Sequence, residues 1–162
     1  MTTKKNYGFT TTILHNDRRK GIEHGSLHKP VHTSVAFGYA DARQLASVFQ
    51  GKEAGFRYGR QGNPTVSALE DKVNKMEDGV ATLCFATGMG AIGAVVQSLL
   101  RAGDHVVSSA FLFGNTNSLF GTLGDFGVEV SKVDATAVAH VAAAVRPNTR
   151  MVFVETVANP GT

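Results

Sequence analysis

The sequence predicts an α/β protein in which a mostly parallel sheet carries helices on both faces. From residue 80 onward, apolar segments rich in β-branched residues alternate with helical patterns, which is typical of βαβ units. These apolar segments are short and nearly continuous, as expected for strands that are buried on both faces of a sheet. A glycine-rich turn, Gly88-Met-Gly90-Ala-Ile-Gly93, separates the first such segment from a helical pattern.

The first part of the chain, residues 1–60, is irregular and rich in Gly, His and Thr. Apolar residues recur at helical spacing over 41–50, so one helix is expected there and the remainder is expected to be extended. Asn63 supplies an N-cap acceptor, and Pro64 suits the first position of a helix. A second helix should therefore begin at residue 64 and end at Asp78-Gly79.

The rest of the chain is predicted element by element from the alternation of its patterns. Strands are expected over 81–86, 105–109, 128–133 and 150–155, and helices over 89–100, 116–125 and 135–145. An α/β fold normally continues into another helix after such a last strand. We therefore expect a domain that is incomplete at its C-terminal end.

Composition excludes several classes of protein. No stretch of the 162 residues approaches the ~20 uninterrupted apolar residues of a membrane-spanning helix. Lys4 and Lys5 have no apolar run behind them, so no secretory signal is expected and a cytoplasmic protein is predicted. The single cysteine, Cys84, excludes an internal disulfide and a multi-thiolate zinc site, and we expect it to be a small core residue.

The positive charge is concentrated in the first part of the chain. Residues 1–60 hold ten Lys and Arg against four Asp and Glu, whereas residues 61–162 hold six against nine. These cations are scattered among acids and accompany no nucleic-acid motif, so neither a nucleic-acid nor a membrane partner is expected.

Three histidines, His24, His28 and His32, are spaced four apart, as metal ligands on one helix would be. Gly25 lowers the helix propensity of this segment, and Pro30 removes an interior hydrogen bond. Ordinary loop histidines are therefore favoured, and no metal site is predicted.

The glycine-rich turn satisfies the pattern G-x-G-x-x-G and should open a helix, where free N–H groups favour a phosphate. A nicotinamide cofactor would also need an acid at the end of the next strand. That strand ends in Ser108-Ser109-Ala110, so a dinucleotide is disfavoured. Helix–strand packing is the alternative explanation of the glycines, and phosphate binding of another kind is favoured over the dinucleotide.

A second candidate segment, residues 57–65, combines a guanidinium, a phenol, turn glycines and a helix cap. Arg60 offers paired planar donors that suit a phosphate or a carboxylate, and Tyr58 adds another donor. The alternative is a helix-capping loop with an exposed arginine.

Three motifs together resemble one family: Tyr58-Gly-Arg-Gln-Gly-Asn-Pro-Thr65, Ala86-Thr-Gly-Met-Gly-Ala-Ile92 and Glu155-Thr-Val-Ala-Asn-Pro160. Their order and spacing are similar to those of the cysteine/methionine-metabolism (transsulfuration) family of pyridoxal-phosphate enzymes. That family includes cystathionine γ-synthase, O-acetylhomoserine sulfhydrylase and methionine γ-lyase. The resemblance implies a fold-type I enzyme, with residues 1–60 as an N-terminal arm that contributes to the neighbouring subunit's active site. Residues 61–162 would be the first part of the cofactor-binding large domain.

The resemblance also implies a cofactor, pyridoxal 5′-phosphate, and the residues that hold it. Gly88 and Met89 would bind its phosphate through backbone N–H groups. Tyr58 and Arg60 would bind the phosphate of the neighbouring subunit's cofactor. Phe113 stands where many members have a tyrosine that stacks on the pyridine ring, and it preserves the stacking surface without the hydroxyl. The last implied residue is Asn159, near the cofactor's phenolic oxygen and the substrate carboxylate.

The implied activity is γ-replacement on O-acetyl- or O-succinylhomoserine, a small amino-acid substrate, by sulfide or cysteine. A γ-lyase and a non-catalytic fragment that binds a phosphate ligand are the alternatives. The implied assembly is a homo-oligomer, a dimer of dimers. The family's Schiff-base lysine matches no residue of this chain, and Lys132 falls within a predicted strand, so no catalytic residue is assigned. Activity is expected only when the remainder of the enzyme, its C-terminal part, completes the chain.

Overall fold

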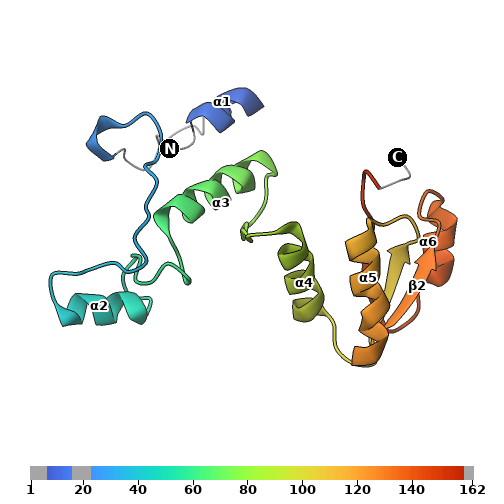
Figure 1. Ribbon diagram of the computed structural model, residues 1–162. Helices are drawn as coiled ribbons and strands as arrows, with labels where there is room; N and C mark the ends of the chain where they lie inside the picture. The colour runs from blue at the N-terminus through green and yellow to red at the C-terminus, as the bar shows by residue number, and fades with distance from the viewer. Residues whose placement is uncertain (1–6, 16–22, 159–162) are drawn as a thin grey trace, which may run out of the picture. The chain divides into compact units, whose positions relative to one another are not determined.

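The computed structural model describes residues 7–15 and 23–158, and divides the chain into two compact units (Figure 1). The first unit spans Met1–Cys84 and the second Phe85–Thr162. In the described ranges no helix is both long and apolar enough to cross a membrane, the longest being a helix of 13 residues. The predicted functional division at residue 60 remains a prediction.

The first unit is helical. Its elements are α1 (Phe9–His15), the short 3-10 helix η2 (Glu23–Gly25), α2 (Ala42–Phe49) and α3 (Pro64–Met76). The predicted cap at Asn63 is confirmed, because its Oδ1 accepts from Thr65 N. Asp41, expected as the first residue of a helix, is instead the N-cap of α2, and its carboxylate accepts from two N–H groups of that helix. The prediction that all residues before Asp41 are extended was wrong. Over Phe9–His15 only Phe9, Ile13 and Leu14 are apolar, which is too few residues to establish a helical period.

This unit contains little core of its own. Val48 is its buried hydrophobic residue among those the structure describes, and large apolar side chains such as Leu69 and Val80 are exposed. Phe37 and Phe56 pack at a centroid distance of 5.7 Å. Because apolar burial supplies most folding free energy, the small core contributes little stabilisation to this unit.

The second unit is the predicted parallel α/β domain. Its elements are α4 (Gly88–Leu99), β1 (His105–Ser109), α5 (Gly114–Thr122), η3 (Leu123–Phe126), β2 (Glu129–Val133), α6 (Val138–Ala144) and β3 (Thr149–Phe153). The strands are all parallel, in the order β2-β1-β3. Figure 1 shows α5 and α6 on opposite sides of the sheet, which confirms the predicted helices on both faces.

The central strand β1 is buried along its whole length, whereas β2 and β3 are partly exposed. The core combines β1 with one side of α4 and α5 and consists of Val96, Leu100, Val106, Leu112, Phe120, Leu123 and Val128. Gly127 ends η3 with a φ of 76°, and a Cβ there would lie 3.1 Å from Ala102 Cβ. Glycine is therefore required at this turn.

Two predictions about residues 81–86 were wrong. The segment is not a strand, because none of the three described strands pairs with it and an unpaired segment lacks ladder hydrogen bonds. Cys84 is only partly buried and is not a core residue. Its N–H donates to Glu70 Oε1 at 3.0 Å, which connects the segment to α3 instead.

Candidate functional site

The start of α4 presents two backbone donors that the helix does not use. Thr87 is the N-cap, and its Oγ1 accepts from Gly90 N at 2.9 Å while its carbonyl accepts from Ala91 N at 3.1 Å. The first N–H groups of a helix have no intrahelical acceptor, which leaves those of Gly88 and Met89 for a ligand. Donors of this kind suit a phosphate, because the helix dipole adds positive potential there.

The glycines of this turn have different roles. Gly88 is exposed, and a Cβ on it would meet no atom within 4 Å. A Cβ on Gly90 would lie 3.0 Å from Thr87 Oγ1 and would crowd the cap. The next strand, β1, ends at Ser109 without an acidic residue, so the structure offers no partner for a dinucleotide's ribose at that position.

A second group of residues lies at the start of α5. The N–H of Phe113, the N-cap position, donates to Glu155 Oε2 at 2.8 Å. The Thr116 hydroxyl donates to Glu155 Oε1 at 2.9 Å, and Met89 Sδ lies 4.0 Å from the same hydroxyl oxygen. Glu155 therefore joins the segment after β3 to the first turn of α5, and Thr116 joins α5 to the first turn of α4.

Phe113 and Thr116 differ in exposure. Thr116 is 2% exposed, whereas the Phe113 side chain is 45% exposed and is available to an aromatic ligand. A cavity of about 430 Å³ adjoins this group and includes Ser109, Phe111, Thr136 and Glu155. It lies where β1 and β3 end, and ligands of parallel α/β sheets bind at the carboxyl ends of the strands.

In the first unit, Tyr58 and Arg60 lie in an exposed loop. The Arg60 guanidinium carbon lies 5.1 Å from the centre of the Tyr58 ring, a cation–π distance. Tyr58 is 40% exposed, and both polar ends are open to a ligand. The adjacent Arg57 has a structural role, because its Nη1 donates to the Val48 carbonyl at 2.6 Å.

The loop is ordered by contacts to the segment that precedes α2. Gly59 N donates to the Val35 carbonyl at 2.7 Å, and Ala36 forms an antiparallel bridge with Tyr58. Asn63 Nδ2 donates to the His32 carbonyl at 3.1 Å, and His32 N donates to Thr65 Oγ1 at 2.8 Å. The loop is thus held independently of the side chains that a ligand would contact.

The structure places the predicted site residues in two groups. Gly88, Met89 and Phe113 belong to the second unit, where Thr116 connects the last two, and Tyr58 and Arg60 belong to the first. Asn159 lies outside the described residues. No role was predicted for Glu155 or Thr116, although Glu155 is a polar residue at the end of a predicted strand, which is a signal for a site residue.

The predicted absence of a metal cluster concerns His24, His28 and His32. Among the residues the structure describes, no three His, Cys, Asp or Glu side chains converge in a way that could hold a metal ion. His32 Nε2 instead lies 3.2 Å from Glu23 Oε2. Lys132 lies in β2, and its Nζ donates to Asn117 Oδ1 at 2.5 Å, as expected for a structural lysine.

His105, the first residue of β1, is fully buried. Its Nδ1 lies 2.7 Å from Thr149 Oγ1 and its Nε2 2.9 Å from Ser131 Oγ. Burial lowers the pKa of His105 from its ordinary 6.5, the Arg146 guanidinium lowers it further, and the Glu129 carboxylate opposes this. The lowered pKa favours the neutral ring, which cross-links three strands.

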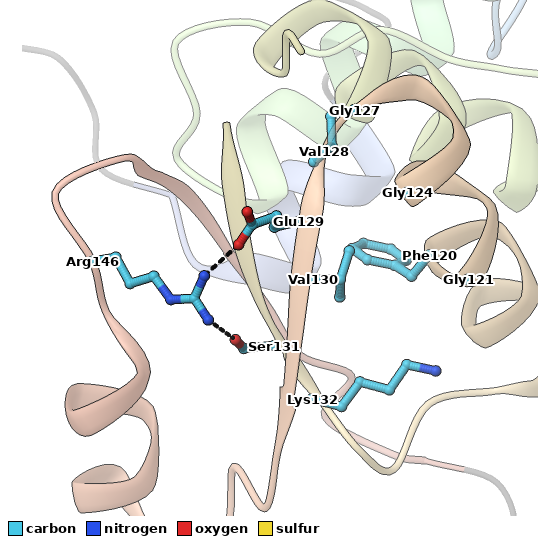
Figure 2. Close-up of a pocket in the computed structure, with 10 residues that line it drawn as sticks. All are labelled: Phe120, Gly121, Gly124, Gly127, Val128, Glu129, Val130, Ser131, Lys132 and Arg146. Carbon is cyan, nitrogen blue, oxygen red and sulfur yellow. Dashed lines mark hydrogen bonds and ion pairs between the residues drawn. The ribbon is translucent and has the colours of Figure 1, made fainter. Parts of the chain in front are cut away.

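Arg146 lies beside the outer strand. Figure 2 shows it on one side of β2, bonded to Glu129 and Ser131, with Phe120 on the other side. These residues line a cavity of about 550 Å³ that contains none of the predicted site residues. The perturbed histidine and this cavity therefore belong to the structural frame of the sheet and are separate from the candidate site.

Known proteins resemble this chain over nearly its whole length. Residues 10–162 match the family described as Cys/Met metabolism PLP-dependent enzyme. An L-methionine gamma-lyase from Fusobacterium nucleatum subsp. polymorphum is 41% identical over 161 residues, which are 99% of this chain and 40% of that protein. An O-acetyl-L-homoserine sulfhydrylase from Corynebacterium glutamicum is 36% identical over 156 residues, 95% of this chain and 36% of the relative.

A solved structure is similar to this chain in its fold. It is described as an O-acetylhomoserine (thiol)-lyase from Campylobacter jejuni and contains N′-pyridoxyl-lysine-5′-monophosphate. The TM-score is 0.83 at 28% identity, with 96% of this chain and 38% of that chain covered. The present chain thus spans about 40% of the length of the curated relatives it matches.

Proposed function

Since this chain belongs to the Cys/Met metabolism family of pyridoxal-phosphate-dependent enzymes, we propose that it forms the N-terminal part of an enzyme of γ-replacement. The substrate would be an activated homoserine ester, O-acetyl- or O-succinylhomoserine, and the nucleophile sulfide or cysteine. The observation that carries the proposal is the pair of N–H groups left available at the start of α4, close to the first turn of α5 that follows Phe113.

The residues of the second unit fit the cofactor by their chemistry. The N–H groups of Gly88 and Met89 can donate to its phosphate, and Gly88 carries no side chain that would crowd it. The exposed ring of Phe113 can stack on a pyridine ring. Pyridoxal phosphate, when bound, supplies an electron sink for reactions at the carbon atoms of an amino acid.

The residues of the first unit would complete the phosphate site of a neighbouring subunit. Arg60 contributes a charged donor pair and Tyr58 a phenol, and both are exposed on a loop held by its backbone. This role requires an oligomer, for which we propose a dimer of dimers. Asn159 would lie near the cofactor's phenolic oxygen and the substrate carboxylate.

We prefer γ-replacement to γ-elimination because residue 113 is a phenylalanine, which has no hydroxyl. The side chain cannot move a proton, and a small acidic nucleophile such as sulfide relies less on a hydroxyl partner than an elimination does. Elimination is the second candidate, and the 41% identity with an L-methionine gamma-lyase favours it. A fragment that binds a phosphate ligand without chemistry is the remaining alternative.

The first experiment is an absorbance spectrum of the purified assembled protein, together with the intact mass of every polypeptide present. We expect a band near ~420 nm that borohydride removes, with the mass of the reduced cofactor on the polypeptide that supplies the lysine. Absence of the band from a preparation reconstituted with pyridoxal phosphate would contradict the proposal.

The second experiment separates the two reactions. The assembled enzyme is incubated either with O-acetylhomoserine and sulfide or with methionine alone. Acetate and a new thiol amino acid in equal amounts from the first mixture indicate replacement. Methanethiol, ammonia and a 2-oxo acid from the second indicate elimination, and a higher kcat/KM there would reject γ-replacement as the main activity.

A further inference from the structure

We propose that Glu155 and Thr116 are positioning residues that hold Phe113 and Met89 in place as neighbouring walls of the cofactor site. This inference rests on the proposed function, because it concerns the same site. It goes beyond that function by assigning roles to two residues that themselves need not contact the cofactor.

The N-terminus of α5 is held by a residue from outside the helix. Phe113 occupies the N-cap position, but its side chain has no oxygen that could accept from the helix, and α5 has no side-chain cap. Glu155 Oε2 instead accepts from the N–H of the N-cap residue itself, Phe113, at 2.8 Å. Negative charge at a helix N-terminus is also favoured by the helix dipole. The backbone from which the Phe113 ring projects is therefore fixed from outside the helix.

The hydroxyl of Thr116 is buried and needs a hydrogen-bond partner. Water can replace a hydrogen bond at an exposed group at small cost, but Thr116 is 2% exposed and its hydroxyl needs a partner inside the protein. Glu155 Oε1, at 2.9 Å, is that partner. The carboxylate thus makes two bonds in different directions, which fix its orientation relative to α5.

Thr116 also connects Glu155 to the phosphate end of the proposed site. Met89 Sδ lies 4.0 Å from Thr116 Oγ1, and Met89 also carries one of the two N–H groups left available at the start of α4. A shift of Thr116 would therefore move the contact that locates Met89. Glu155 thereby links the proposed stacking surface and the proposed phosphate donors.

The test uses three substitutions in the assembled enzyme. Glu155→Leu keeps the approximate side-chain volume and removes both bonds. Glu155→Gln keeps both in a neutral form, because its oxygen can accept from Phe113 N and its amide can donate to Thr116 Oγ1. Thr116→Val keeps the shape and removes the hydroxyl. Asn117→Ala is the matched control, since it removes the contact of the same helix to Lys132 on β2.

The readouts are the dissociation constant for pyridoxal phosphate and the visible circular dichroism of the bound cofactor, which reports the orientation of its ring in the site. For Glu155→Leu we expect about tenfold weaker binding and a dichroism band reduced by half or more, with a smaller change for Thr116→Val. Glu155→Gln should restore both quantities to within about twofold of the wild type. Asn117→Ala should leave both unchanged.

Two results would overturn the inference. The first is a wild-type dichroism band and affinity in folded Glu155→Leu, which would leave the proposed function intact. The second is equal loss in Glu155→Leu, Glu155→Gln and Asn117→Ala, because that pattern indicates general destabilisation. If the wild-type enzyme binds no pyridoxal phosphate, the proposed function fails and this inference fails with it.

Discussion

His105 Nδ1 lies 2.7 Å from Thr149 Oγ1, and through this contact the first residue of β1 is bonded to the first residue of β3. The second ring nitrogen reaches Ser131 of β2. A neutral imidazole can donate at one nitrogen and accept at the other, so it satisfies both hydroxyl groups. A protonated ring would place two donors and a charge in the core.

The stability of the second unit should therefore fall in acid. The folded-state pKa of His105 lies below its ordinary value of 6.5, because of burial and of Arg146, despite the opposing Glu129. Below pH 6.5 the unfolded chain then binds more protons than the folded one, so the free energy of unfolding decreases as the pH falls. Urea unfolding at pH 7.5, 6.5 and 5.5, followed by far-UV circular dichroism, measures this decrease.

Two variants assign the effect to one residue. His105→Gln should have a lower urea midpoint at pH 7.5 but a weaker dependence on pH, because it cannot titrate. His140→Gln, which changes an exposed histidine on α6, should retain the dependence of the wild type. Equal pH dependence in the wild type and in His105→Gln would contradict the prediction.

Gly88→Pro is expected to separate the stability of α4 from its capacity to bind phosphate. Position 88 is the first residue of the helix, where proline is well tolerated, and Thr87 already has the extended backbone that a following proline requires. The substitution removes one N–H donor and fills the open space beside it. Thermal unfolding should be nearly unchanged, while the affinity of the assembled enzyme for pyridoxal phosphate should fall about tenfold.

A matched control is available within the same helix. Gly93→Ala lies where a Cβ meets no atom within 4 Å, so it should stabilise the helix by about 0.5–1 kcal/mol and leave the affinity unchanged. If Gly88→Pro binds the cofactor as tightly as the wild type, the phosphate does not use this donor.

Features that depend on local sequence signals were predicted, whereas features that depend on contacts between distant residues were not. The cap at Asn63 and the buried strand β1 were predicted because their signals are local. Residues 81–86 have the composition of a strand, but strand formation depends on a partner that composition cannot supply. The bonds from Glu155 to Phe113 and Thr116 span 42 and 39 residues, and no spacing rule connects positions so far apart.

Arg60→Ala is expected to weaken cofactor retention in the assembled oligomer, because it removes charge-assisted bonds to the phosphate. The loop should keep its structure, since Arg57, Asn63 and the backbone hold it without Arg60. We expect the dissociation constant for pyridoxal phosphate to rise about tenfold to a hundredfold. Equilibrium dialysis of the assembled enzyme measures it. Arg43→Ala, an exposed arginine on α2, is the control for a general charge effect.

A mixed oligomer tests whether Arg60 acts across the subunit interface. In hybrids of wild-type subunits with Arg60→Ala subunits, each altered subunit should weaken the site of its neighbour. An affinity loss confined to the cofactor of the altered subunit itself would refute the proposed exchange of arms.

Replacement of Phe113 tests the stacking role apart from any proton transfer. Phe113→Leu keeps an apolar side chain but removes the aromatic face, so pyridoxal phosphate binding should weaken about two- to tenfold. Phe113→Tyr keeps the face and adds a hydroxyl, so affinity should stay within about twofold of the wild type. The exposure of the present ring leaves room for that hydroxyl, since 45% of the side chain is open. Equal affinity of the leucine and tyrosine variants would show that the ring does not stack on the cofactor.

Phe113→Tyr also tests proton transfer. If an acid–base partner limits elimination in this enzyme, this variant should raise the rate with methionine more than the rate with O-acetylhomoserine and sulfide.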